Sequence, residues 1–438
     1  MAVAALGWRA GWLHPGPNAP APNSYVDARR CQACHAAIHA SYQHVGMARS
    51  FAPIPQAPAI EDYERNNRLV HAPSGRHYEV MRRGGRVFQR RYELDASGAE
   101  VNSFELEATY AIGSGNHART YLSRSESGEL IELPVTWYTQ ENRWGMSPGY
   151  DNAAPPDFTR LADESCLFCH NGYPAAGGAL ADGIDCQRCH GPGSRHVEAA
   201  SGATIVNPAR LSPELQMDVC MQCHLETTSA ELPAMLRRFD RQPYSFRPGE
   251  PLSAYMIHFD HAPGAGREEK FEIVGQAYRL RQSKCFRNSQ GRLTCISCHD
   301  PHMAPRGDNA VAWYRAKCVA CHASVAGASH PDIRAADCAS CHMRKRRTED
   351  AVHVIMTDHL IQRKPPSLDL ARALPERASS YQGSLVVYYP PHLSSSDLER
   401  GRRRRDRLRR REDRHQSGEE RQDCGGGGSA PRASRRFC

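Results

Sequence analysis

Residues 186–196 read CQRCHGPGSRH, and the pattern Cys-x-x-Cys-His at the start of this stretch decides how the chain folds. The pattern occurs seven times along the 438 residues. Two thiols one helical turn apart can bond the two vinyl groups of one porphyrin, and the adjacent histidine can then bind the iron. The sequence therefore predicts seven covalently attached haem c groups with their irons. The motifs are Cys31/Cys34/His35, Cys166/Cys169/His170, Cys186/Cys189/His190, Cys220/Cys223/His224, Cys295/Cys298/His299, Cys318/Cys321/His322 and Cys338/Cys341/His342.

Structural zinc is the main alternative for paired cysteines. Sixteen residues separate Cys169 from Cys186, and the same number separates Cys321 from Cys338, which fits four-cysteine zinc sites. Such a site has no use for a histidine directly after the second cysteine, yet all seven pairs have one although only 22 of the 438 residues are histidine. Seven is also an odd number of pairs, so one pair would lack a partner for a four-cysteine zinc site. A disulfide framework fits poorly because disulfides within Cys-x-x-Cys pairs would do little to stabilise the fold of a chain this long.

The charge of the chain is unevenly distributed. Residues 400–438 contain fourteen arginines and six acidic residues, so this segment carries the whole net charge of +8 and the rest is close to neutral. We therefore expect no nucleic-acid partner. The sequence has no run of about 18 apolar residues, so we expect no membrane span.

The location follows from the cofactor, because haem c is attached outside the cytoplasm. We expect a periplasmic or otherwise extracytoplasmic protein. Residues 1–14 (MAVAALGWRAGWLH) lack a basic start and have only a short apolar stretch. We therefore expect the true signal peptide to lie upstream of Met1.

The spacing of the motifs suggests the domain organisation. One motif stands alone, and three follow within about 60 residues and three more within about 50 residues. The long gap after the first motif contains short runs rich in Val, Tyr, Phe and Thr, separated by Gly/Ser/Asp turns, which predict antiparallel strands at 78–81, 86–94, 101–110 and 130–138. The expected fold class is a multihaem cytochrome c of mostly short α-helices and coil around a haem core, with a small antiparallel β insertion. The expected segments are a leader remnant and Pro-rich linker (1–23), a first haem segment (24–50), a β-rich insertion (51–160), a multihaem core with six haem sites (161–360), a linker (361–394) and a low-complexity tail (395–438) that is disordered or read out of frame.

The histidines outside the motifs decide between electron carrier and enzyme. Fifteen remain, enough to give every iron a second axial ligand. A haem with two histidine ligands is closed to substrates, whereas an iron with an open position can bind and reduce a small molecule. His196 and His302 follow tight Gly/Pro turns that direct each of them away from its own haem and towards a neighbour. Other candidates are His44, His117, His258, His261, His330, His353 and His359.

Methionine and cysteine are the competing ligands. Met47, Met256, Met303, Met343 and Met356 lie near motifs, but packing against porphyrin is their expected role. Cys285 is the unpaired cysteine of the main body, and we expect it to be a buried thiol that packs against its neighbours. No Cys-x-x-Cys-Lys site, which would suggest a lysine-ligated catalytic haem, is present.

Several stretches resemble a family of exported bacterial multihaem cytochromes c that are often fused to C-terminal tetratricopeptide repeats. The family belongs to a wider group with the nitrification tetrahaem cytochromes and hydroxylamine-oxidoreductase-like cytochromes. The resemblance covers about residues 24–393. It is carried by Tyr25-Val26, CHGPGSRH (189–196), Ser283-Lys284-Cys285-Phe286, CISCHDPH (295–302), CASCHM (338–343) and Met356-Thr357-Asp358-His359.

The resemblance implies a set of distal iron ligands and a missing part. After about Ser394 the repeats expected from the family do not follow, which favours a frameshift or truncation. By the resemblance, the distal ligands are His44, His117, His196, His302, His330 and His353, with His261 (or His258) as the seventh.

The leading functional hypothesis is electron transfer through closely packed, mostly bis-His haems. Electrons would pass between redox partner proteins, from a quinol-linked or cytochrome donor to an unknown acceptor. The alternative is a reductase or oxidase of a small nitrogen or sulfur compound at one five-coordinate haem.

Overall fold

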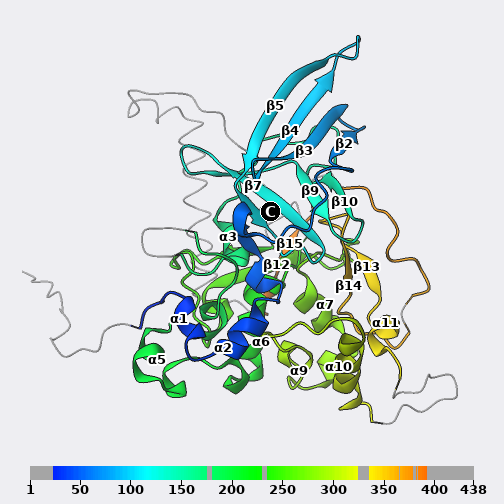
Figure 1. The fold of residues 1–438 in the computed structure, drawn as a ribbon. Coiled ribbons are helices and arrows are strands. Elements are labelled where there is room, and N and C mark those ends of the chain that lie inside the picture. Colours follow the sequence, from blue (N-terminus) through cyan, green and yellow to red (C-terminus); the bar gives the residue numbers. More distant parts are fainter. Residues whose placement is uncertain are drawn as a thin grey trace, which may run out of the picture.

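The computed structural model describes residues 23–174, 180–228, 234–323, 335–364, 366–377, 381 and 383–391. The leader up to residue 22, His330 and the tail from residue 395 lie outside these described residues. In Figure 1 a β-rich part occupies the top of the molecule, and most of the helices lie beneath it.

Four strands form an antiparallel sheet that projects from the rest of the molecule (Figure 1), in the order β2-β3-β4-β5. The turn between β3 and β4 is the pair Gly84-Gly85, whose φ angles of 57° and 79° suit glycine because it has no Cβ. The strands are β2 (Arg68–His71), β3 (Arg76–Arg83), β4 (Arg86–Leu94) and β5 (Glu100–Ala108).

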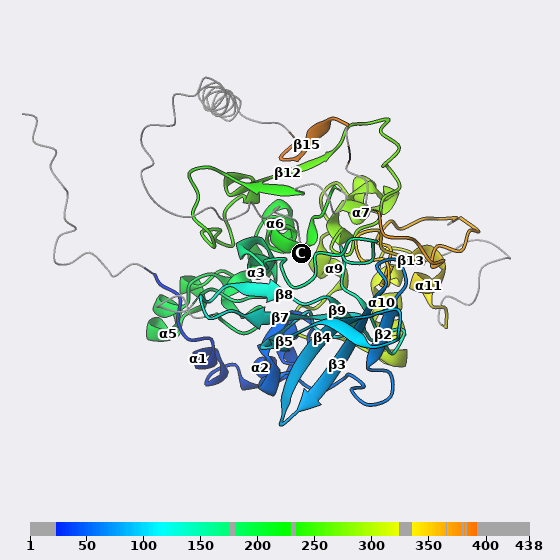
Figure 2. The ribbon, with the colours of Figure 1, turned by 90° about the horizontal axis from the view of Figure 1, so that it is seen from above.

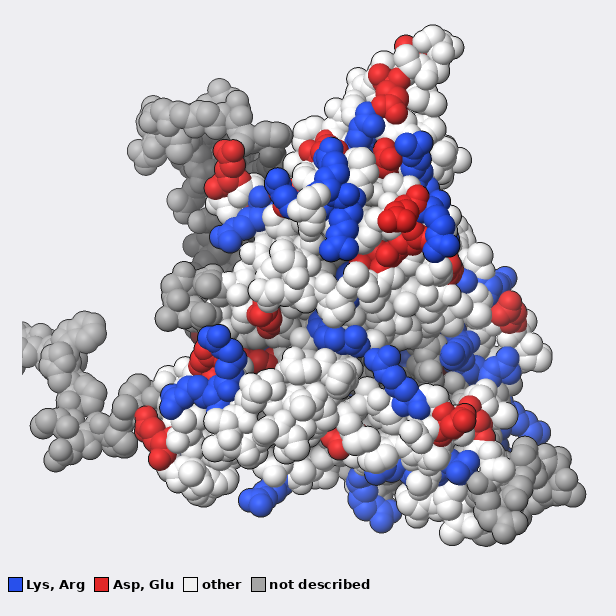
Figure 3. Space-filling model, viewed as in Figure 1, with Lys and Arg blue, Asp and Glu red and all other residues white. Residues whose placement is uncertain are grey.

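Opposite charges face each other on the projecting sheet. Arg86 of β4 pairs with Glu107 of β5, and Arg83 of β3 pairs with Glu105. Figure 3 shows basic and acidic side chains interspersed over this sheet and over the face below it. Each exposed pair contributes little to stability, but together they favour this strand register.

A six-stranded sheet lies between the projecting sheet and the helices. Its order is β1-β6-β7-β9-β10, with β8 paired to β7. Tyr78 and Val87 of the projecting sheet pack against Tyr121, Trp137 and Trp144 of this one in a shared apolar core. The strands are β1 (Phe51–Pro53), β6 (Tyr110–Ile112), β7 (Ala118–Arg124), β8 (Leu130–Glu132), β9 (Val135–Tyr138) and β10 (Arg143–Met146).

The helical part consists of short helices, and a second apolar core lies among them. Ser212 begins the long helix α6 by accepting a hydrogen bond from the Leu215 backbone, with Pro213 at the first position. Phe168, Met217 and Phe246 belong to this second core. The helices are α1 (Arg29–Gln32), α2 (Ala36–Tyr42), α3 (Glu164–His170), α4 (Gln187–His190), α5 (Ser194–Ala199), α6 (Pro213–His224), α7 (Gln276–Gln282), α8 (Lys284–Asn288), α9 (Cys295–Cys298), α10 (Gly307–Val319) and α11 (Cys338–His342), with 3-10 turns η1 (Met47–Arg49), η2 (Ile54–Gln56), η3 (Gly202–Thr204), η4 (Pro208–Arg210) and η5 (Leu252–Ala254).

Two smaller sheets lie outside the long gap after the first motif. One has the order β11-β12-β15, and the other pairs β13 with β14. Figure 2 shows β12 and β15 side by side on the far side of the helices from the projecting sheet. The strands are β11 (Met235–Arg237), β12 (Met256–His261), β13 (Lys345–Arg347), β14 (Ile355–Thr357) and β15 (Leu385–Tyr389).

The expectation of a small β insertion is therefore wrong in extent. The expected strands are present, but they belong to two sheets of four and six strands, and the described residues add two further sheets outside the insertion. The sequence signal underestimated the β structure because most of the additional strands have only 3–6 residues, too few for a clear alternating pattern, although β7 has seven.

Gln89 joins the two large sheets and provides a test of the β-rich part. Its buried amide donates to the Val135 carbonyl at 2.6 Å and accepts from the Val135 N–H at 2.9 Å. We expect Gln89→Leu to lower the free energy of unfolding by about 2–3 kcal/mol, because both backbone groups lose their partner. Urea unfolding followed by tryptophan fluorescence measures this. Gln56→Leu, at an exposed position, is the control and should change it by less than about 0.5 kcal/mol.

Candidate haem attachment sites

The Cys-x-x-Cys-His motifs, numbered 1 to 7 in chain order, lie in or next to short helices. The histidine N–H donates to the carbonyl of the first cysteine, at 2.9 Å in motif 1 and 3.0 Å in motif 3. The same bond measures 2.9 Å in motifs 5 and 6. This single helical turn places both thiols and the imidazole close together, as attachment to one porphyrin requires.

Three motif histidines face a second histidine from another part of the chain. His35 and His196 have ring centroids 6.1 Å apart and planes 13° apart. The other two pairs are His190 with His302, at 5.9 Å and 19°, and His299 with His359, at 6.1 Å and 27°. In each pair the second histidine faces a motif other than the one that precedes it in the chain.

The gap within these pairs fits a metal ion. A close ring stack such as that of Tyr25 on Tyr173 has its centroids only 3.6 Å apart and leaves no room for an ion. Two imidazoles bound to one metal ion through bonds of about 2 Å place their centroids roughly 6 Å apart. The donor set and its spacing therefore suit an iron held by two histidines.

Hydrogen bonds orient the imidazoles for this role. Nδ1 of His190 donates to the Val206 carbonyl at 2.8 Å, and Nδ1 of His342 donates to the Gln362 carbonyl at 2.8 Å. A carbonyl only accepts, so Nδ1 carries the proton and Nε2 is left to bind a metal. The same pattern holds for His170 (to Ser50 O, 3.3 Å), His196 (to Ser201 O, 3.0 Å) and His359 (to Thr357 O, 3.0 Å).

Burial keeps several of these histidines neutral, which is the form that binds metal. It lowers the pKa of His299 to about 4. Burial also lowers the pKa values of His170, His190 and His359. Proton competition for these ring nitrogens is therefore weak at neutral pH.

The polypeptide leaves parts of three motifs open to solvent. Cys34 and His35 of motif 1, Cys321 and His322 of motif 6, and Cys341 of motif 7 are all exposed. The physical reason is that the helices next to them, α1, α10 and α11, contain no residue that the protein buries. A porphyrin bonded at these motifs would supply the missing apolar cover, so the role of these residues in attachment stays a prediction.

Thiols from different motifs lie next to one another. Cys189 of motif 3 is near Cys223 of motif 4, and Cys298 of motif 5 is near Cys318 of motif 6. The motifs therefore form a connected series in space. The thiol pairs close enough to shift each other's pKa by hydrogen bonding are 1 with 3 (Cys31 and Cys186), 2 with 4 (Cys169 and Cys223), 4 with 5 (Cys220 and Cys295) and 6 with 7 (Cys318 and Cys338).

Other expected distal ligands occupy different surroundings. His353 uses one ring nitrogen towards Asp151 at 3.1 Å, and Arg143 approaches the other at 3.3 Å. His44 is exposed and lines a cavity of about 770 Å³ with Met303, Arg306 and Trp313. His261 lies 3.7 Å from the Asp260 carboxylate. His330 is outside the described residues.

Two further histidines have ring nitrogens without a hydrogen-bond partner among the described residues. His258 on β12 is fully buried with both ring nitrogens unpartnered, and burial lowers its pKa to about 3. His117 has a buried, unpartnered Nδ1. Both therefore have a nitrogen available for a metal.

Sequence reasoning left His359 out of the seven distal ligands, although it lies opposite His299. The Met356-Thr357-Asp358-His359 segment can be recognised in the sequence as part of the family resemblance. The choice between His353 and His359 as the iron ligand, however, depends on which of them has a ring nitrogen free to bind a metal. Cys285 is exposed, so the expectation of a buried thiol is wrong. It lies near the thiols of Cys298 and Cys321.

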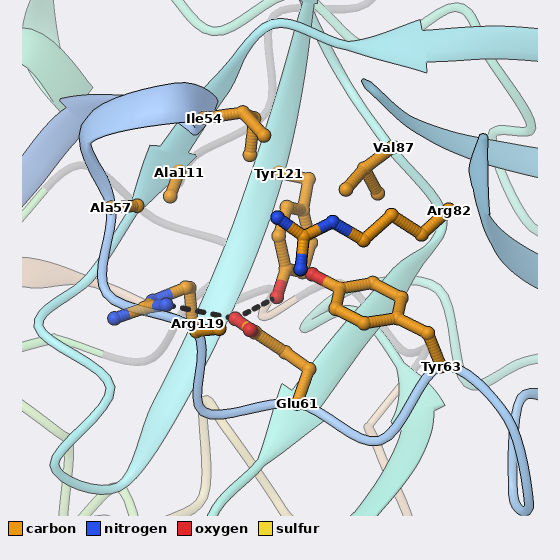
Figure 4. Close-up of a pocket in the computed structure, with 10 residues that line it drawn as sticks. Ile54, Ala57, Glu61, Tyr63, Arg82, Val87, Ala111, Arg119 and Tyr121 are labelled. Atoms are coloured by element: carbon orange, nitrogen blue, oxygen red, sulfur yellow. Dashed lines mark hydrogen bonds and ion pairs between the residues drawn. The ribbon is translucent and has the colours of Figure 1, made fainter. Parts of the chain in front are cut away.

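A small cavity in the β-rich part surrounds a buried group of hydrogen-bonded side chains and serves the fold. Figure 4 shows Glu61 accepting hydrogen bonds from Arg119 at 2.8 Å and from Tyr121 at 2.5 Å. The cavity holds about 20 Å³, room for a single water molecule. The cavity is too small for a substrate. The hydrogen bonds of Glu61 connect the loop before β2 to the six-stranded sheet.

Comparison with known proteins agrees with the geometry. Residues 288–327 match the doubled CXXCH motif family. The multiheme cytochrome MtrA of Shewanella baltica (strain OS185) is 22% identical over 169 residues, which are 34% of this chain and 49% of the relative. The chain thus spans about half the length of this curated relative.

No solved structure matches the chain. Within the described residues, none of the helices has the length and apolar character needed to cross a membrane. A doubled attachment motif and a relative that is itself a multiheme cytochrome agree with histidine pairs spaced for one metal ion, and together these findings support a multihaem c-type cytochrome.

Proposed function

We propose that the chain carries seven haem c groups and transfers electrons along them between redox partner proteins outside the cytoplasm. The observation that carries this proposal is the set of three parallel histidine pairs about 6 Å apart. An iron between two protein imidazoles has no open position for a substrate. Haem c, when bound, supplies reversible one-electron chemistry.

The residues that would hold the cofactors are the fourteen motif cysteines and seven motif histidines. His196, His302 and His359 would be distal ligands for motifs 1, 3 and 5. His258 and His117 are candidates for two further motifs because each has a ring nitrogen without a partner among the described residues.

The arrangement of the motifs supports transfer within the chain. Thiol neighbours connect motifs 1, 3, 4, 5, 6 and 7 in that order, and motif 2 joins at motif 4. Porphyrins attached at neighbouring thiols would be neighbours themselves. Motif 4 would then be the junction of the series.

The partners and the location belong to the same proposal. We expect a quinol-linked or cytochrome donor and a separate acceptor. An extracytoplasmic location is required for haem attachment.

One observation favours a second candidate function. The described residues include no histidine ring that faces His170 of motif 2 or His224 of motif 4 as His196 faces His35. An iron at either motif could keep an open position, as a reductase or oxidase of a small nitrogen or sulfur compound requires. A high-spin ferric signal in the wild-type protein would favour this alternative.

The number of haems is directly testable. We expect the protein, produced with a cytochrome c maturation system, to have the mass of the chain plus seven haem c groups. Replacing both cysteines of motif 6 with alanine should reduce the count to six, measured by mass spectrometry and pyridine haemochrome absorbance. Cys285→Ser is the control and should retain seven. A wild-type count below seven would contradict the proposal.

The distal ligand of motif 5 is testable by spectroscopy. We expect His359→Ala to convert one haem from low spin to high spin, because His299 would then be the only protein ligand. Electron paramagnetic resonance measures the change. His353→Ala is the matched control and should leave the spin state unaltered, since His353 is bonded to Asp151. A high-spin signal from His353→Ala alone would contradict this assignment.

A further inference from the structure

Arg188 is a buried cation inside a haem attachment motif. It lies between the two cysteines of motif 3, at the start of α4, and its side chain is only 1% exposed. It is one of the largest fully buried side chains of the molecule. A charge in this position requires an explanation, because transfer of a charge from water into the protein interior is strongly unfavourable.

The surroundings of Arg188 are aromatic and nearly without hydrogen bonds. The guanidinium carbon lies 4.3 Å from the ring centroid of Phe168, 5.0 Å from that of Tyr173 and 5.4 Å from that of Tyr244. Nη2 donates to the Phe168 carbonyl at 2.7 Å. Nε and Nη1 are buried and have no hydrogen-bond partner among the described residues. The ring faces compensate only part of the desolvation cost.

Other buried arginines in the described chain have a carboxylate, and Arg188 does not. Arg279 pairs with Asp358 at 2.7 Å, and Arg119 pairs with Glu61 at 2.8 Å. The nearby Asp185 carboxylate accepts the backbone N–H of Arg188 and forms no ion pair with its guanidinium within 4.0 Å. No carboxylate among the described residues therefore neutralises Arg188, and the Cys223 thiol beside it would be an uncharged thioether in the haem-loaded protein.

The position of this charge relates it to three haem motifs. Arg188 belongs to motif 3 and lies close to the thiols of Cys169 in motif 2 and Cys223 in motif 4. These are the motifs that meet at the junction of the series. A fixed charge in a poorly polarisable interior acts over several ångströms with little screening.

We propose that Arg188 raises the reduction potentials of the haems at motifs 2, 3 and 4, so that electrons reside preferentially at this junction. The inference rests on the proposed electron-transfer function. Reduction of a ferric haem by one electron from the donor adds one negative charge to the site. The buried, unneutralised guanidinium stabilises that added charge, and its stacking on three rings keeps it in place.

The test is a redox titration of the haem-loaded protein, followed by visible absorbance. Arg188→Met removes the charge, and Arg188→Gln removes it while retaining a donor for the Phe168 carbonyl. We expect both variants to shift the high-potential part of the titration curve to more negative potential. Arg188→Lys keeps the charge and should leave the curve close to wild type. Arg65→Met, at an 87% exposed side chain paired with Asp62, is the surface control and should cause no shift.

The possible results separate the inference from the function on which it rests. Seven haems with an unchanged titration curve in both neutral variants would overturn the inference while leaving electron transfer intact. This result would mean that a haem propionate or another anion already neutralises Arg188. Loss of haem in both neutral variants but not in Arg188→Lys would also overturn it, because the cation would then serve assembly. Absence of haem from the wild-type protein would overturn the proposed function itself.

Discussion

The architecture depends on imidazoles from distant segments that face each other across the width of one metal ion. His35 and His196 connect the N-terminal helices to α5, and His190 and His302 connect α4 to the loop after α9. A porphyrin in each gap would supply apolar surface that the polypeptide lacks. This accounts for α9, α10 and α11, in which no residue is buried by protein alone. Such helices have no reason to be stable without a cofactor to pack against.

The β-rich part is stabilised differently. It has a conventional core of aromatic and aliphatic side chains between two sheets, with Gln89 and Glu61 completing the hydrogen bonds of buried backbone and side-chain groups. It also supports the haem sites. Ser50, just before β1, accepts the Nδ1 proton of His170 through its carbonyl and donates its hydroxyl to the carbonyl of the same residue. The sheets are therefore a scaffold that orients motif 2.

The electrostatics around Arg188 differ from those around the other buried arginines of the described chain. In the β-rich part, buried arginines are matched by carboxylates, which holds loops and sheets together at little net charge. Among the haem motifs the buried guanidinium of Arg188 is matched by ring faces instead. In the proposed electron-transfer function, a cation without a carboxylate partner would lower the free energy of the reduced haems. In a protein without redox cofactors, the same buried charge would only lower the stability of the fold.

The sequence by itself determined the cofactor, because the motif is local: two thiols and a histidine within five residues need one helical turn. It also predicted the strands at 78–81 and 86–94, whose alternation and Gly84-Gly85 turn are local as well. It could not decide between His353 and His359, or between His258 and His261. The neighbouring residues in sequence do not show which ring nitrogen meets a carboxylate and which faces a metal ion. Only the tertiary structure decided the histidine partners, the extent of the β sheets and the isolation of Arg188, because each depends on contacts between residues far apart in the chain.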